Sequence, residues 1–147
     1  MSSGRDRERP RIVVGVDGFE PSKAALRWAI DQAKLTGAIV EAVTAWHIPA
    51  GTSGISAADL PDYPQDARAV LTESITESST SDSGVEIRCY VVEGRAGQAL
   101  VDAAEGAGLL VVGCRGHGDL TETMLGSVAQ FCSHYAPCPV VIMRGRH

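Results

Sequence analysis

The sequence contains no apolar run that approaches the roughly 20 residues of a membrane-spanning helix. Its first residues also lack the apolar centre of a secretory signal peptide, so we expect a cytoplasmic protein. Basic residues are scattered along a chain of net charge -5, which leaves no broad cationic face for DNA or RNA. We therefore expect neither a membrane protein nor a nucleic-acid-binding protein.

Cysteine and aromatic residues are both scarce. The four cysteines, Cys89, Cys114, Cys132 and Cys138, form no C-x-x-C pair, so reduced thiols are expected and a zinc site is not. A bridge between Cys132 and Cys138 stays open, because they lie six residues apart around an expected helix end. With aromatics at 5%, the core must be mainly aliphatic, which suits an α/β protein.

The order of strand and helix patterns predicts the fold class. Strand patterns cover 11–17, 38–46, 85–94, 109–113 and 139–144, and helical spacing falls between them. The run 85–94 alternates apolar and polar residues, so one face of that strand is expected to be less covered. This alternation predicts an α/β fold: one three-layer domain, with a five-stranded, mostly parallel sheet flanked by four helices, Rossmann-like in its connections. Residues 11–147 form that domain, and the charged arm 1–10 is expected to be disordered.

Glycines gather at residues 111–130, where the fourth strand ends and the last helix begins. Gly113 and Gly116 would let a phosphate approach the backbone, or would let the chain adopt a positive φ. Gly126 and Ser127 precede a helix whose first N–H groups carry partial positive charge. The alternative is that these glycines only form turns and caps. Neither the P-loop pattern nor the dinucleotide pattern G-x-G-x-x-G is present.

The glycine spacing resembles a known motif. "GCRGHG" followed by "LGSV" fits the G-x-x-G, nine residues, G-[ST] loop of the universal stress protein family. "IVVGVDG", "EPSKAALRWA", "GRAGQALVDAA" and "HYAPCPVVIMR" extend the similarity over almost the whole chain. The chain resembles the single-domain, ATP-binding branch, which implies an adenine-nucleotide alpha-hydrolase-like domain that commonly dimerises.

The resemblance implies a site for ATP, and its residues carry over position by position. They are Asp17 near the nucleoside, Ala45 at the adenine edge, and Val112, Gly113, Arg115, Gly116, Gly126, Ser127 and Val128 around the ribose and phosphates. The carboxylates of Asp119 and Glu122 have two interpretations: they face solvent, or a Mg²⁺ ion held mainly by the phosphates lies between them and the phosphates. No residue is assigned a catalytic or metal-binding role.

Two positions depart from the family pattern. Phe19 replaces a usual serine, and its ring is expected either to pack under the pocket or to narrow it. Cys114 stands where the family commonly has serine. It is interpreted either as a redox-sensitive thiol or as a small residue that fills a small space. Trp28 and Trp46 are expected in the core; the alternative, which applies above all to Trp46 because it follows Ala45, is that the ring stacks on a base.

Together these features predict an ATP-binding protein with a regulatory role in stress response. The alternatives are a weak ATPase using Arg115, a sensor of AMP or cyclic AMP, and a nucleotide-free dimeric adaptor. The last strand is expected at a sheet edge, where the resemblance implies a homodimer through Val140, Val141, Ile142 and Met143. The irregular segment 47–64 is expected to be either a lid or simply flexible.

Overall fold

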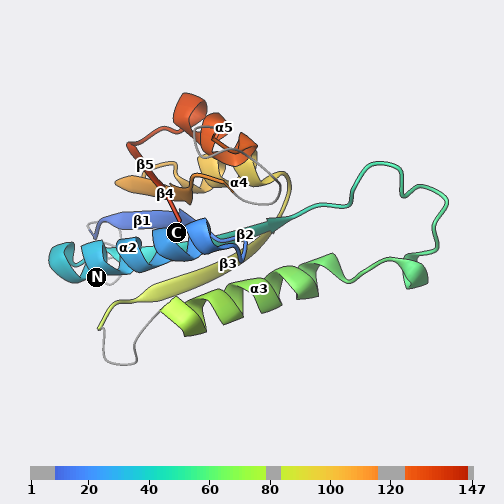
Figure 1. The fold of residues 1–147 in the computed structure, drawn as a ribbon, viewed down its shortest axis with the longest axis horizontal. Helices are drawn as coiled ribbons and strands as arrows, with labels where there is room; N and C mark the ends of the chain where they lie inside the picture. Colours follow the sequence, from blue (N-terminus) through green and yellow to red (C-terminus); the bar gives the residue numbers. More distant parts are fainter. Residues whose placement is uncertain (1–8, 79–83, 116–124, 146–147) are drawn as a thin grey trace.

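The structure is a computed structural model that describes residues 9–78, 84–115 and 125–145 (Figure 1). The strands are β1 (Arg11–Gly15), β2 (Ile39–Trp46), β3 (Ile87–Glu93), β4 (Leu109–Gly113) and β5 (Val140–Met143). The helices are α2 (Glu20–Thr36), α3 (Tyr63–Ser78), α4 (Ala96–Ala103) and α5 (Ser127–Tyr135), and the described residues also include a 3₁₀ turn, η1 (Ala57–Asp59).

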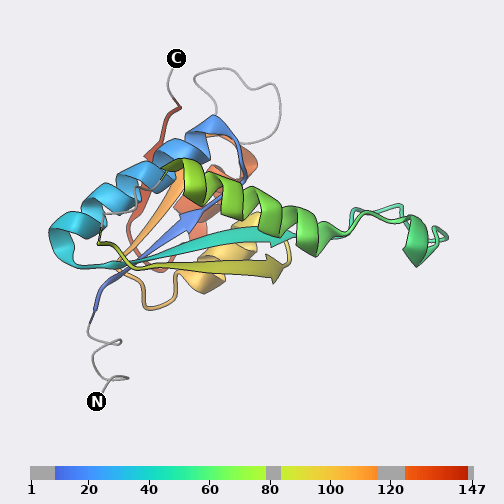
Figure 2. The ribbon, with the colours of Figure 1, turned by 90° about the horizontal axis from the view of Figure 1, so that it is seen from below.

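All five strands are parallel, in the order β3-β2-β1-β4-β5. Helices α2 and α3 cover one face of the sheet, and α4 and α5 cover the other, which gives three layers (Figure 2). This arrangement confirms the predicted fold class. It also confirms that β5 lies at a sheet edge.

Side chains alternate between the two faces along β2, and each face packs against its own helices. Val40 and Ala42 belong to the apolar cluster under α2 and α3, whereas Val43 belongs to the cluster under α4 and α5. Because the period of a strand is two residues, Thr44 and Trp46 lie on the α2/α3 side and Ala45 on the other. This assignment places the residues at the end of β2 relative to the helices.

Helix α2 begins and ends where the sequence predicts. Pro21 occupies the first turn, where its missing N–H removes no intrahelical bond. At the other end Gly37 has φ 77°, and its N–H donates to the carbonyl of Ala33 at 2.9 Å. Buried alanines on the inner face, such as Ala25 and Ala29, let the helix approach the sheet closely.

A charged pair is largely buried at the amino ends of β1 and β2. Nη1 of Arg11 donates to the carboxylate of Glu41, whose side chain is only 11% exposed. The second nitrogen, Nη2, donates over 2.7 Å to the carbonyl of Glu105, two residues after α4, and Nη1 also lies 3.5 Å from the carbonyl of Ala103, the last residue of α4. Arg11 therefore ties two strands to the helix that covers them, at the end of the sheet where the amino termini of the strands lie.

Residues 1–8, the main part of the arm expected to be disordered, lie outside the described residues. Arg9 pairs with Glu86 at 2.8 Å, and the carbonyl of Pro10 accepts from the N–H of Ile39 at 2.9 Å. Within the described ranges, no helix has the length and apolar character needed to cross a membrane.

We expect Arg11→Met to lower the free energy of unfolding by about 2–4 kcal/mol, because the Glu41 carboxylate would stay buried without its partner. The matched control is Arg9→Met, which removes a pair whose side chains are 37% and 42% exposed. Its effect should stay within about 0.5 kcal/mol. Urea unfolding measures both, and equal losses would contradict the account of the buried pair.

Candidate functional site

A cavity of about 660 Å³ opens at the carboxyl ends of β1, β2 and β4. Eight of the nine residues that the sequence assigns to the site line it: Asp17, Ala45, Val112, Gly113, Arg115, Gly126, Ser127 and Val128. The ninth, Gly116, lies outside the described residues, as do His117, Asp119 and Glu122. The structure thus brings together in one cavity residues that are far apart in the sequence.

The amino terminus of α5 forms one end of the cavity. Ser127, Val128 and Ala129 make up its first turn and all line the cavity. The first intrahelical bond runs from the N–H of Gln130 to the carbonyl of Gly126, at 3.0 Å. The three preceding N–H groups therefore have no intrahelical acceptor, and the helix dipole makes this end favourable for an anion.

Gly126 has a structural role at the end of the segment that connects β4 to α5. Its N–H donates to the carbonyl of Cys114 at 2.7 Å, which joins the two ends of the segment between β4 and α5. With φ -68° and ψ 166°, it adopts an extended conformation as the N-cap of α5. Its own N–H is thus occupied within the protein, so the donors that face an anion come from the residues after it.

Gly113 is required by packing between β4 and α2. A Cβ atom added there would lie 2.8 Å from the carbonyl carbon and Cβ of Pro21 and 2.8 Å from the nitrogen of Ser22. These are backbone or ring atoms at the start of α2, and they cannot move aside cheaply. Two reasons for this glycine were considered from the sequence, phosphate approach and a positive φ. The second was wrong, because Gly113 is not among the described glycines with a positive φ. The close contact of strand and helix is a reason that the sequence did not reveal.

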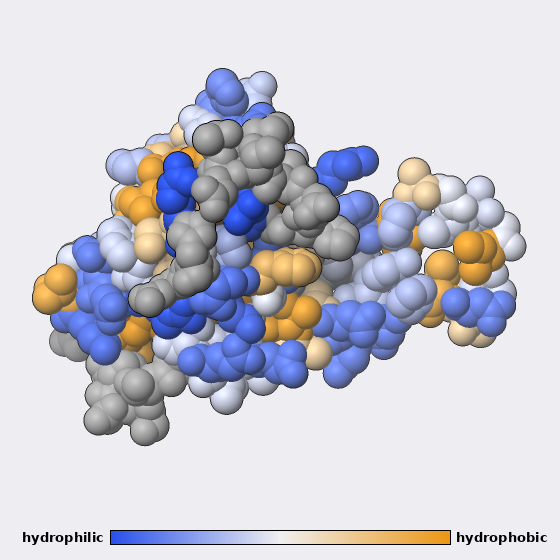
Figure 3. All heavy atoms as spheres, in the orientation of Figure 1, coloured by the Kyte–Doolittle hydropathy of each residue, from blue (hydrophilic) through white to orange (hydrophobic). Residues whose placement is uncertain are grey.

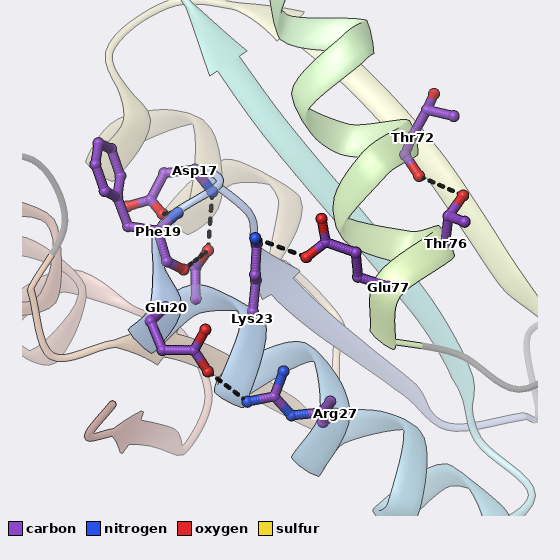
Figure 4. A network of polar contacts seen from close by, with 9 residues as sticks. Asp17, Phe19, Glu20, Lys23, Arg27, Thr72, Thr76 and Glu77 are labelled. Carbon is purple, nitrogen blue, oxygen red and sulfur yellow. Dashed lines mark hydrogen bonds and ion pairs between the residues drawn. The ribbon is translucent and has the colours of Figure 1, made fainter. Parts of the chain in front are cut away.

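Asp17 and Ser22 hold the turn from β1 into α2 (Figure 4). The Asp17 carboxylate accepts from the N–H of Phe19 at 2.9 Å, and the N–H of Asp17 donates to Oγ of Ser22 at 3.1 Å. The Ser22 hydroxyl in turn donates to the carbonyl of Phe19 at 3.1 Å. These bonds replace the side-chain cap that Phe19, as the N-cap of α2, does not provide.

Phe19 itself lies outside the cavity. The residue is 45% exposed and is not among those that line the cavity, and its ring points away from α2 in Figure 4. The structure therefore supports neither of the two roles considered from the sequence. On the next turn of α2, Nζ of Lys23 pairs with the carboxylate of Glu77 at 2.7 Å. This ion pair links α2 to α3 and raises the pKa of Lys23.

The opposite end of the cavity is formed by the end of β2 and the start of α3. Trp28 packs against the core, as predicted, but Trp46 belongs to neither apolar cluster and lines the cavity. The expectation of a core position for Trp46 was wrong because Trp46 is the last residue of β2, where the sheet gives way to the cavity. Tyr63, the first residue of α3, also lines the cavity.

Sequence reasoning missed the contribution of α3. Tyr63, Asp66, Ala67 and Val70 all line the cavity, at the i, i+3, i+4, i+7 spacing of one helical face. That spacing was the available signal, but it was weak because Tyr63 and Asp66 interrupt the apolar pattern. Asp66 brings a second carboxylate to the cavity, in addition to that of Asp17.

The segment 48–62 between β2 and α3 extends away from the domain in both ribbon views (Figures 1 and 2). Ile48 and Ile55 are about half exposed, and apolar residues appear on this extension in the surface view (Figure 3). The segment begins and ends next to His47 and Tyr63, two residues of the cavity rim. In this conformation it does not cover the cavity, so the structure does not show the lid considered from the sequence.

The four cysteines are free thiols, so no bridge joins Cys132 and Cys138. Cys114 is 6% exposed and packs inside the fold, in agreement with its interpretation as a small residue in a small space. Burial, with a smaller contribution from Cys138, raises the pKa of Cys132 to about 11. Among the described residues, no group of three or more His, Cys, Asp or Glu side chains is placed to hold a metal ion.

Comparison with known proteins gives one consistent family. The model of the universal stress protein family matches residues 8–144. A universal stress protein of Mycolicibacterium smegmatis is 32% identical over 144 residues, covering 91% of this chain and 48% of the relative. One of Mycobacterium tuberculosis is 33% identical over 144 residues, covering 95% of this chain and 47% of the relative. The chain therefore spans about half the length of these relatives.

Solved structures show the same fold. The universal stress protein UspA of Lactobacillus plantarum has a TM-score of 0.76 at 20% identity, covering 92% of this chain and 97% of its own. A universal stress protein solved in complex with cAMP has a TM-score of 0.67 at 28% identity, covering 91% of this chain and 95% of its own. The strand order and layers described above are thus those of a known fold.

Gly113→Ala should lower the free energy of unfolding by about 1–3 kcal/mol without any ligand present, because the added Cβ meets the backbone of α2. The matched control is Gly108→Ala, whose Cβ would lie 3.7 Å from the carbonyl oxygen of Arg11, an ordinary contact. We expect the control to change stability by less than about 0.5 kcal/mol. Thermal unfolding of the ligand-free chain measures both, and a Gly113→Ala variant as stable as the parent would contradict the packing role.

An alkylating reagent at pH 8 should modify Cys89 of the native chain well before Cys132. Cys89 is exposed, although partial burial raises its pKa as well. At pH 8 a thiol of pKa about 11, like that of Cys132, is ionised in about one molecule in a thousand, and the thiolate is the reactive form. Peptide mass mapping gives both rates, and equal rates would show that Cys132 is not buried in solution.

Proposed function

The chain belongs to the universal stress protein family, and on that premise we propose that its cavity binds an adenine nucleotide. The observation that carries the proposal is the arrangement of the cavity. One end presents the N–H groups of an α-helix, and the other end presents aromatic side chains. A nucleotide has the matching order of groups, with an anionic phosphate at one end and a flat aromatic base at the other.

The distance between the two ends also suits a nucleotide. The helix α5 follows β4, and Trp46 ends β2, and these two strands lie on either side of β1. Neighbouring strands are about 4.8 Å apart, so the ends of β2 and β4 are separated by about 10 Å. A phosphate at the first turn of α5 and a base beside β2 would leave the ribose over the end of β1, next to Asp17.

Similarity to a protein solved with cAMP, at 28% identity over 91% of this chain, supports an adenine ligand. Within this class we propose ATP, with any Mg²⁺ held mainly by the phosphates. We further propose that the chain acts by binding, in a regulatory role in stress response, rather than by turnover. Hydrolysis assisted by Arg115, which lines the cavity, is the alternative that release of phosphate from ATP would reveal.

We also propose a homodimer through β5. This strand pairs with β4 on one side and lies at the edge of the five-stranded sheet. Its four residues Val140, Val141, Ile142 and Met143 are apolar and only partly buried in the single chain. An apolar edge strand is a surface that proteins usually cover. Light scattering at micromolar concentration tests the dimer, and a monomeric mass would contradict it.

Ser127→Pro tests the phosphate end of the site with little damage to the fold. Proline is favoured at the first position of a helix, and Gly126 before it is already extended, with ψ 166°, as a residue before proline should be. The variant loses the N–H and the hydroxyl of Ser127. We expect AMP and ATP to bind at least about tenfold more weakly, as measured by calorimetric titration.

Two controls make this result specific. Ser127→Ala removes the hydroxyl but keeps the N–H, so its loss of affinity should be smaller. Adenosine has no phosphate, so its affinity should be the same for the parent chain and for Ser127→Pro. A parent chain, purified free of nucleotide, that binds none of AMP, cAMP and ATP would overturn the proposed function.

A further inference from the structure

Two aromatic side chains, Trp46 and Tyr63, line the cavity from neighbouring elements. Trp46 ends β2 on the same face as Val40 and Ala42, which is the face covered by α2 and α3. Tyr63 begins α3 and shares a helical face with Val70, another lining residue. Both side chains therefore stand at the β2–α3 end of the cavity, away from α5.

Neither ring is explained by packing within the domain. Both residues are only half-buried, and neither belongs to an apolar cluster of the described residues. Trp28, in contrast, packs against the cluster under α2. Aromatic residues at the wall of a cavity offer a π-face to whatever enters it, and a flat heteroaromatic base is the ligand group that such a face binds by stacking.

We propose that Trp46 and Tyr63 hold the base of the bound nucleotide by stacking against it. This inference rests on the proposed function and adds a base-binding wall contributed by the side chain that ends β2 and by the first turn of α3. The wall lies across the cavity from the N–H groups of Ser127 and Val128. The phosphate and the base would thus be held by different strands and helices, and each end can be tested separately.

The chain carries only two tryptophans, which makes Trp46 a reporter for its own role. In Trp28→Phe the remaining indole is that of Trp46, and we expect its fluorescence to change saturably on titration with AMP. In Trp46→Leu the indole of Trp28 should give no such change. Trp46→Leu should also bind AMP about tenfold more weakly by calorimetry, because leucine keeps an apolar side chain but cannot stack.

Tyr63→Leu should weaken AMP binding in the same direction, and Tyr90→Leu is its matched control. Tyr90 is 42% exposed on β3 and does not line the cavity, so its replacement should leave the AMP affinity unchanged. Inorganic pyrophosphate, which has no base, should bind Trp46→Leu and Tyr63→Leu as it binds the parent. A loss for pyrophosphate as well would indicate general damage to the site and would overturn the stacking role.

The outcomes separate this inference from the function on which it rests. If the parent chain binds AMP and both leucine variants bind it equally well, the aromatic wall does not hold the base and only this inference fails. If the parent chain binds no adenine nucleotide, the proposed function fails with it. An unchanged Trp46 signal in Trp28→Phe under saturating AMP would contradict the stacking directly.

Discussion

The contact between the start of α2 and the end of β4 is the constraint on which the site depends. At Gly113 the strand and the helix approach so closely that a Cβ atom would lie 2.8 Å from the atoms of Pro21 and Ser22. This contact fixes the end of β4 against the turn that Asp17 and Ser22 hold together. Two walls of the cavity meet here, one from β1 and one from β4. Their relative position depends on Gly113 having no side chain.

The parallel sheet explains why the remaining walls arrive at the same place. In a parallel sheet with helices on both faces, the carboxyl ends of all strands, and the starts of the helices that follow them, lie at the same end of the sheet. The cavity accordingly collects lining residues from the starts of α2, α3, α4 and α5. The positive ends of the helix dipoles therefore lie at this end of the sheet, where the carboxylates of Asp17 and Asp66 carry the opposite charge. The Arg11–Glu41 pair lies at the other end of the sheet, where the strands begin; it joins the strands to α4 and does not line the cavity.

Sequence patterns were sufficient for the fold, and together with the family resemblance they named eight residues that line the candidate cavity. Buried β-branched runs, Pro21 and Gly37 predicted the strands and the limits of α2, because these signals are local. The glycine spacing placed Gly113, Gly126 and Ser127 at the cavity. Contacts between distant segments were not predictable: the close approach of Pro21 to Gly113, the Gly126–Cys114 hydrogen bond, and the packing of α3 that places Tyr63 at the cavity that Trp46 also lines. Each depends on packing that a single chain segment does not reveal.

The most direct test of the account is a two-dimensional amide and indole NMR spectrum of the chain, recorded with and without AMP. The account predicts the largest shifts at the N–H groups of Ser127, Val128 and Ala129 and at the indole N–H of Trp46. It predicts little change near Arg11 and Glu41, at the other end of the sheet. Shifts confined to that other end, or no shifts at saturating AMP, would contradict binding of a nucleotide across the cavity.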